Sequence, residues 1–283
     1  MDDVRTVPAA DTSFLLRSSG VEAGQAPPVL LLHGVPETSS CWRDVAPRLA
    51  AGRQVLAPDL PGLGGSTFAG PYDVGTLVAQ LAALIEAEAT VPVDVVGHDW
   101  GGVLALGLAG LRPDLVRRLV VVNAPFRSGP PLHRAVHLPL FALPVVPEAA
   151  FRLAGRRAVD VMLRAGWRSE PPLDPELRAE YEAAYAGGPR VAAMLGYYRS
   201  AVRPRRGALR PGSALAAGLP PVDVERALVL WGALDPVLPI ATGEAVVRDL
   251  GPGTEMTTIP GAGHFVLEEA PDEVSEVLLA FLA

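Results

Sequence analysis

Residues 94–102 read DVVGHDWGG, and this short stretch decides how the rest of the chain is interpreted. An apolar run ends at Gly97, and a single carboxylate, Asp99, stands between that glycine and the pair Gly101 and Gly102. The outline is that of Gly-x-Ser-x-Gly, a sharp strand-to-helix turn that exposes a nucleophile, with aspartate in place of serine. Glycines allow such a turn and a close approach of strand and helix. An aspartate that merely caps the following helix is the structural alternative.

The sequence around this stretch alternates between two patterns. Five apolar runs bounded by turn residues predict buried strands at 27–34, 53–62, 92–99, 117–126 and 226–235. Helical patterns follow or separate them at about 74–89, 100–111, 240–250 and 271–282. This β-α-β order predicts an α/β fold with a mostly parallel, doubly wound sheet and right-handed crossovers. Ligands of such sheets bind beyond the carboxyl ends of the strands, which is where Asp99 falls.

The alternation breaks once, between about residues 127 and 220. This segment contains Pro-rich pieces and helical patterns, but no clear buried strand. We interpret it as a helical cap inserted between two strands. The expected division is a core of residues 1–126 and 221–283 and a cap of residues 127–220.

Composition excludes several classes of protein. Hydrophobic residues make up 49% of the 283 and charged residues 19%, which is typical of a globular chain, and the formal net charge of −7 does not favour binding to nucleic acid. All 24 basic residues are arginine, so there is no Schiff-base or P-loop lysine. The single cysteine, Cys41, is expected to be a small buried residue. We see neither a signal peptide nor an apolar run of the ~18 residues that span a membrane, and we expect a cytoplasmic protein, with a homodimer left open.

Two further residues come in a fixed order after Asp99. Asp235 ends the run 226–235, and His264 lies 29 residues later in IPGAGHFVLEEAP. The order nucleophile, acid, histidine is that of the α/β-hydrolase fold. Each residue alone would more often be a turn or surface residue, but together they predict a catalytic triad.

A second loop is expected to face the same turn. The apolar run 27–34 ends at His33 and Gly34, and Val35 and Pro36 come directly after it. The turn formed by these four residues can direct a backbone N–H towards Asp99. An oxyanion hole needs two such donors, which we assign to the N–H groups of Val35 and Trp100. An ordinary strand-end turn is the alternative.

Six motifs together resemble the epoxide hydrolases of the α/β-hydrolase superfamily, from about residue 28 to the C-terminus. They are HGVPETSSCWRDV (33–45), PDLPGLGGS (58–66), GHDWGG (97–102), NAPF (123–126), WGALDPVLP (231–239) and GAGHFVLEEAPDEV (261–274). GHDWGG also occurs in haloalkane dehalogenases, so it indicates an aspartate nucleophile without specifying the leaving atom. Haloalkane dehalogenases often carry a halide-binding Asn where this chain has Val35, and fluoroacetate dehalogenases carry Arg where it has Trp100.

The resemblance also implies two acid groups in the cap that bind and protonate the epoxide oxygen. MLGYYRSAV (194–202) is similar to the helix that carries the second of them, here Tyr198. The first position matches His137 in HLPLFALPVVPE, where most relatives have tyrosine and some use a His–Tyr pair. Core packing of Tyr198 and a surface role of His137 are the alternatives. Three other tyrosines remain open for the acid pair: Tyr197, Tyr181 and Tyr185.

The resemblance implies hydrolysis of a small hydrophobic epoxide by water, without a metal or organic cofactor. Asp99 would form an ester with the substrate, and His264, oriented by Asp235, would activate the water that hydrolyses it. A haloalkane or haloacid dehalogenase using the same ester is the alternative enzyme, and a ligand-binding receptor on this fold is the alternative from another class. The residues expected to line the pocket are His33, Pro36 in a cis peptide, Trp42 and Phe265, while Trp167 is expected to pack within the cap.

Overall fold

The computed structural model describes residues 3–20, 26–89, 92–127, 137–186, 188–202 and 219–283, apart from the side chains of 137–139 and 202. Its centre is an eight-stranded sheet with the strand order β1-β2-β4-β3-β5-β6-β7-β8. Only β2 runs against its neighbours β1 and β4, and all the other pairs are parallel. The strands are β1 (Asp3–Ala9), β2 (Thr12–Ser19), β3 (Val29–Leu32), β4 (Val55–Pro58), β5 (Val93–His98), β6 (Val116–Val122), β7 (Arg226–Gly232) and β8 (Glu255–Ile259).

The predicted fold class is confirmed. The five predicted strands are β3 to β7, and the four predicted helices are α2 (Val74–Glu88), α3 (Trp100–Leu111), α10 (Ile240–Leu250) and α12 (Pro271–Leu282). The sequence analysis missed the β1–β2 hairpin and β8. Two of these three strands, β1 and β8, form the edges of the sheet and carry exposed residues, so they lack a continuous apolar run.

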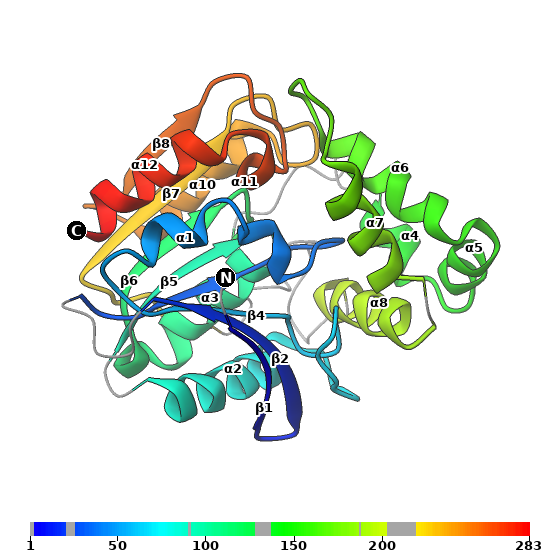
Figure 1. The fold of residues 1–283 in the computed structure, drawn as a ribbon, viewed down its shortest axis with the longest axis horizontal. Coiled ribbons are helices and arrows are strands. Elements are labelled where there is room, and N and C mark those ends of the chain that lie inside the picture. The colour runs from blue at the N-terminus through cyan, green and yellow to red at the C-terminus, as the bar shows by residue number, and fades with distance from the viewer. Residues whose placement is uncertain (1–2, 21–25, 90–91, 128–136, 187, 203–218) are drawn as a thin grey trace.

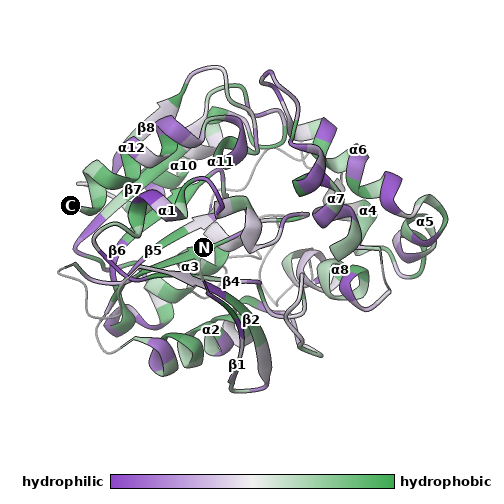
Figure 2. Cartoon of the chain, in the orientation of Figure 1, coloured by the Kyte–Doolittle hydropathy of each residue, from purple (hydrophilic) through white to green (hydrophobic). Residues whose placement is uncertain are grey.

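Helices cover both faces of the sheet (Figure 1). On one face α3 packs on β3, β5 and β6, and α2 packs beside it; on the other, α12 contacts the short α1 (Ala46–Leu49). The inner strands and α3 are buried along almost their whole length, and Figure 2 shows mostly the green of hydrophobic residues there. No helix among the described residues is long and apolar enough to cross a bilayer.

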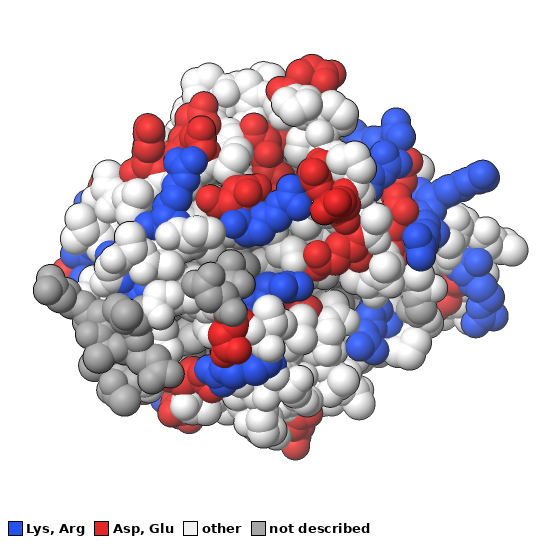
Figure 3. Space-filling model, viewed as in Figure 1, with Lys and Arg blue, Asp and Glu red and all other residues white. Residues whose placement is uncertain are grey.

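Between β6 and β7, the described residues form five helices, and we call them the β6–β7 helices. They are α4 (His137–Ala142), α5 (Val146–Ala154), α6 (Arg156–Gly166), α7 (Pro175–Ala184) and α8 (Gly188–Val202). They lie together to one side of the sheet (Figure 1), and the part of the segment that the structure describes between 137 and 202 contains no strand. On the face shown in Figure 3, arginine and acidic side chains are interspersed over the core and these helices.

Candidate active site

Asp99 lies in a strained turn between β5 and α3. Its backbone has φ 48° and ψ −116°, a conformation that a residue with a side chain rarely adopts. A Cβ atom on Gly97 would lie 2.2 Å from the carbonyl oxygen of Gly101, and one on Gly101 would lie 2.3 Å from the carbonyl oxygen of Leu32. The Asp99 carboxylate makes no capping hydrogen bond to α3, which contradicts the capping alternative. The turn therefore exposes this side chain at the end of β5.

The three residues of the expected triad meet at this turn. The Nε2 atom of His264 lies 3.6 Å from Oδ2 of Asp99, and its Nδ1 atom lies 2.8 Å from Oδ2 of Asp235. The other oxygen of Asp235 accepts hydrogen bonds from the backbone N–H groups of Val237 (2.7 Å) and Leu238 (2.9 Å). His264 is therefore placed between two carboxylates, one of which is fixed by the backbone.

Asn123 supports Asp235, and the sequence analysis did not identify it as a site residue. Its amide donates to Oδ2 of Asp235 at 2.6 Å, and its Oδ1 accepts from the N–H of Gly232 at 3.0 Å. The residue is fully buried with φ 41° directly after β6. Its only signal in the sequence is a polar side chain immediately after the apolar run of residues 119–122.

The loop after β3 brings a backbone donor to Asp99. The N–H of Val35 donates to Oδ1 of Asp99 at 3.1 Å, and the Val35–Pro36 peptide is cis, as the resemblance implies. The imidazole of His33 is buried beneath this loop, where Nδ1 donates to the carbonyl of Gly34 and Nε2 accepts from the N–H of Leu60. His33 thus holds the loop and exposes no surface to a cavity.

A buried ion pair joins this loop to the turn, and sequence analysis also missed it. Oε2 of Glu37 accepts from the N–H of Gly34 (2.7 Å) and from Nδ1 of His98 (2.8 Å). Nε2 of His98 donates to the carbonyl of His264 at 2.9 Å. Burial opposes ionisation of Glu37, but the charge and hydrogen bond of His98 outweigh it and lower the pKa of Glu37. With hydrogen-bond partners at both ring nitrogens, His98 links the three loops of the site.

The charges of the site depend on one another. Burial would raise the pKa of Asp99, but the hydrogen bond and positive charge of His264 lower it below the usual aspartate range. Burial would lower the pKa of His264, but Asp235 and then Asp99 raise it well above its usual value. In the free site, the ionised form of Asp99 and the protonated form of His264 therefore stabilise each other.

Four buried tyrosines lie in α7, directly after it, or in α8, and the hydroxyls of three of them donate to other groups. Tyr181 donates to Oε1 of Glu268 (2.9 Å), Tyr185 to the carbonyl of Glu37 (3.0 Å) and Tyr197 to the carbonyl of Pro61 (2.9 Å).

Tyr198, by contrast, faces the turn. Its ring lies edge-on to that of Trp100, with centroids 5.3 Å apart. Burial and the negative charge of Asp99 raise the pKa of Tyr198, and a hydrogen bond with the Trp100 side chain opposes this shift. Because an indole N–H can only donate, the phenol oxygen of Tyr198 accepts from Trp100.

The other residues singled out in the sequence lie in different parts of the molecule. Phe265 packs on the ring of His264 at 5.3 Å between centroids. Trp42 has no exposed surface, and among the described groups its indole N–H has no partner, so it lies in the core. Trp167 donates to the carbonyl of Ser169, in line with a packing role, and Cys41 is buried as expected. His137 is the first residue of α4, but its side chain lies outside the described residues.

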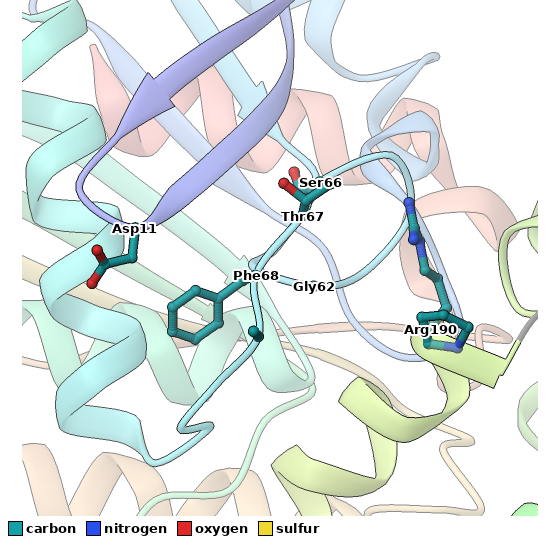
Figure 4. Close-up of a pocket in the computed structure, with 8 residues that line it drawn as sticks. Asp11, Gly62, Ser66, Thr67, Phe68 and Arg190 are labelled. Carbon is teal, nitrogen blue, oxygen red and sulfur yellow. The ribbon is translucent and has the colours of Figure 1, made fainter.

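A cavity of about 390 Å³ lies away from the triad, between the β1–β2 hairpin, the loop after β4 and the start of α8. Asp11 and Arg190 stand on opposite sides of it, with Phe68 between them (Figure 4). Two of its polar groups already serve the fold, since Arg190 donates to the carbonyl of Gly64 and Ser66 to that of Asp59. No triad residue lines this cavity.

Comparisons with known proteins agree with this geometry. The model of the alpha/beta hydrolase family matches residues 29–277. Epoxide hydrolase A of Mycobacterium tuberculosis is 30% identical over 96% of this chain and 98% of its own length. A haloalkane dehalogenase of Bradyrhizobium diazoefficiens is 37% identical, but over only 43% of this chain and 39% of its own.

A solved structure is also similar to this chain. It belongs to a study of epoxide hydrolases of the alpha/beta hydrolase superfamily from metagenomes of hot environments. That structure has a TM-score of 0.82 and 25% identity, and the match covers 99% of this chain and 98% of the other. The chain is a hydrolase and belongs to the alpha/beta hydrolase family, as an epoxide hydrolase-like member of it.

Proposed function

We propose that this enzyme hydrolyses a small hydrophobic epoxide to a vicinal diol through a covalent ester on Asp99. The observation that carries the proposal is a carboxylate on the strained turn, with Oδ1 on the N–H of Val35 and Oδ2 facing His264. A serine attacking an sp³ carbon would form an ether that water cannot cleave here. An aspartate forms an ester and so supplies the carbonyl that the substrate lacks.

In the first step, one oxygen of Asp99 attacks an epoxide carbon and the C–O bond of the ring breaks. The leaving oxygen takes a proton from Tyr198, assisted by His137 on α4. The contact of Tyr198 with Trp100 supports this role, because the indole N–H fixes the phenol oxygen within the influence of the Asp99 charge. Ester formation removes the negative charge of Asp99, which favours the proton transfer from Tyr198.

Before the second step, the His264 imidazolium returns a proton to the Tyr198 phenolate. Neutral His264 then takes a proton from water, and the resulting hydroxide attacks the carbonyl carbon of the ester. The oxyanion forms on the aspartyl group, where the N–H groups of Val35 and Trp100 receive it. Asp235, held by Asn123, stabilises the imidazolium that results. When the tetrahedral intermediate collapses, the departing alkoxide takes the proton of the imidazolium and leaves as the diol. The Asp99 carboxylic acid then gives its proton to His264, which regenerates the ionised Asp99 beside a protonated His264.

Residues 127–220 form the cap in this proposal and close the substrate site over the turn. The hydrogen bonds of Tyr197 to Pro61 and of Tyr185 to Glu37, which join the β6–β7 helices to loops of the core, support that arrangement. The apolar rings of Trp100 and Phe265 favour a hydrophobic substrate. We place the enzyme in the cytoplasm, with water as its second substrate.

A dehalogenase is the second candidate, because the haloalkane dehalogenase relative matches part of the chain. A departing halide needs N–H donors that converge on it. The indole N–H of Trp100 is engaged with Tyr198, and Val35 stands where a halide-binding Asn is common, so the site favours an epoxide oxygen.

The test compares an aryl epoxide such as styrene oxide with a bromoalkane, on the wild type and on Tyr198→Phe. We expect diol formation by the wild type, and a fall in kcat/KM for the epoxide of about 100-fold in Tyr198→Phe, the scale of general-acid catalysis. Tyr197→Phe is the matched control, because its hydroxyl donates to Pro61, and its kcat/KM should stay within about 3-fold of the wild type. Bromide release without diol formation would favour the dehalogenase, and tight ligand binding without turnover would favour a receptor.

A further inference from the structure

One carboxylate outside the triad contacts the backbone on both sides of His264. Glu269 ends the short helix α11 (Val266–Glu269), five residues after His264. Its Oε1 accepts from the N–H of Phe265 at 3.1 Å, and its Oε2 accepts from the N–H of Gly263 at 3.0 Å. The two residues that flank the triad histidine are therefore held by the same side chain.

The same carboxylate also holds the segment that follows α6. Oε2 of Glu269 accepts from the N–H groups of Arg168 (2.8 Å) and Ser169 (2.9 Å). These residues lie about 100 positions away along the chain, in the connection between α6 and α7. Charge-assisted hydrogen bonds of this kind are about twice as strong as neutral ones. Four of them join residues 168–169 to residues 263–265 through one side chain.

The segment that follows α6 and the segment around His264 pack closely against each other. The N–H of His264 donates to the carbonyl of Gly166 at 2.9 Å. A Cβ atom on Gly166 would lie 2.6 Å from the ring of Phe265, and one on Gly263 would lie 2.4 Å from the carbonyl oxygen of Gly166. A displacement of the α6–α7 connection must therefore displace the backbone of His264.

We propose that Glu269 is a positioning residue that fixes His264 relative to the α6–α7 connection and thereby acts in the second half of the reaction. The inference rests on the proposed function, in which His264 is the base for hydrolysis of the ester. Asp99 is placed by the turn after β5 and by Val35, and the hydrogen bonds described for Glu269 involve neither of them. Loss of Glu269 should consequently slow hydrolysis of the ester while leaving its formation nearly unchanged.

The test is rapid-quench single turnover of Glu269→Gln and Glu269→Ala with styrene oxide, with mass spectrometry of the intact protein. Glutamine keeps one acceptor oxygen but puts an N–H₂ group opposite backbone donors. We expect the adduct on Asp99 to form within about 3-fold of the wild-type rate and to decay about 10-fold more slowly in Glu269→Gln, and more slowly still in Glu269→Ala. Glu276→Gln, an exposed change on α12, is the control and should alter neither rate.

The ratio of the two rates separates positioning from general damage. If formation and decay fall by the same factor in Glu269→Gln, or if neither changes, the positioning role is wrong. Glu269→Gln tests the positioning role even if Glu269→Ala fails to fold, because glutamine has the same shape as glutamate. If the wild type forms diol but never an adduct on Asp99, the proposed function itself fails; a wild-type adduct with normal decay in Glu269→Gln rejects Glu269 alone.

Discussion

Asp99 lies between two groups that act at different times. Val35 faces Oδ1, where the oxyanion develops in the second step, and His264 faces Oδ2 at 3.6 Å. While Asp99 is ionised, it holds His264 in the protonated form, in which the histidine cannot accept a proton from water. Ester formation neutralises Asp99 and so removes one of the two charges that raise the pKa of His264.

This coupling predicts a pH dependence for each step. His264 is a base only when neutral, so ester hydrolysis should be fast at high pH and lost as pH falls through the pKa of His264 in the ester form. That pKa should lie below the one in the free enzyme, because the charge of Asp99 is gone. Ester formation should persist to lower pH, since the pKa of Asp99 lies below its ordinary value.

Single-turnover rates at a series of pH values, with an NMR titration of His264 in the free enzyme, check this prediction. Hydrolysis that is independent of pH, or that titrates at or above the pKa of His264 in the free enzyme, would contradict it.

Sequence alone could find the triad but not the residues that support it. Asp99, Asp235 and His264 each follow a strand, in an order that a reader of the sequence can recognise. Asn123 and Glu37 act on partners 112 and 61 positions away, so their roles depend on which strands become neighbours. Trp42 carries an aromatic ring that suits either a pocket or a core, and only its burial distinguishes the two.

At the scale of elements, the sequence predicts the strands that are buried on both faces and the helices that cover them. The strands β3 to β7 and the helices beside them have clear apolar patterns, and their predicted bounds agree to within a few residues. The hairpin β1–β2 and the edge strand β8 are half exposed, so polar residues interrupt their patterns. The β6–β7 helices pack mainly on one another, α4 and α5 on α8 and α6 on α5 and α7, and hydrogen bonds of Tyr185 and Tyr197 join this segment to loops of the core.

The contact between α3 and β3 depends on Gly101, and Gly101→Ala should break it. The added Cβ atom would lie 2.3 Å from the carbonyl oxygen of Leu32 and 2.6 Å from that of His33, both backbone atoms that cannot move away. We expect the free energy of unfolding in urea to fall by about 3 kcal/mol or more, despite the better helix propensity of alanine.

Gly52→Ala is the matched control, because no atom lies within 4 Å of its added Cβ, and its change should stay below about 1 kcal/mol. Equal stabilities of the two variants would show that α3 does not approach β3 this closely.

At the scale of the whole molecule, a buried charge cluster joins the sheet to the C-terminus. Asp94 at the start of β5 accepts from Nη1 of Arg53 (3.0 Å) and from Nε and Nη2 of Arg117 (2.9 and 2.6 Å). Arg53 also donates to the carbonyl of Leu282, and Arg118 to that of Phe281. The cluster lies at the opposite end of β5 from Asp99, so it serves stability and not catalysis.

Asp94→Ala should therefore destabilise the protein without changing the chemistry. Two arginines would lose the carboxylate that compensates their burial, and we expect a loss of about 3–5 kcal/mol in the free energy of unfolding. Asp3→Ala, which breaks an exposed pair with Arg5, should cost less than about 1 kcal/mol. Urea unfolding measures both, and a similar small loss in the two variants would contradict the account of the cluster.

The central claim is that Asp99 forms an ester with the substrate, and His264→Gln tests it most directly. The variant lacks the base for the second step, so incubation with styrene oxide should add the mass of one epoxide molecule to the peptide that carries Asp99. In the wild type, a single turnover in ¹⁸O-water should place the label in the Asp99 carboxylate and not in the diol. An unmodified His264→Gln protein, with the label in the first-turnover diol of the wild type, would mean that water attacks the epoxide directly and that Asp99 is not the nucleophile.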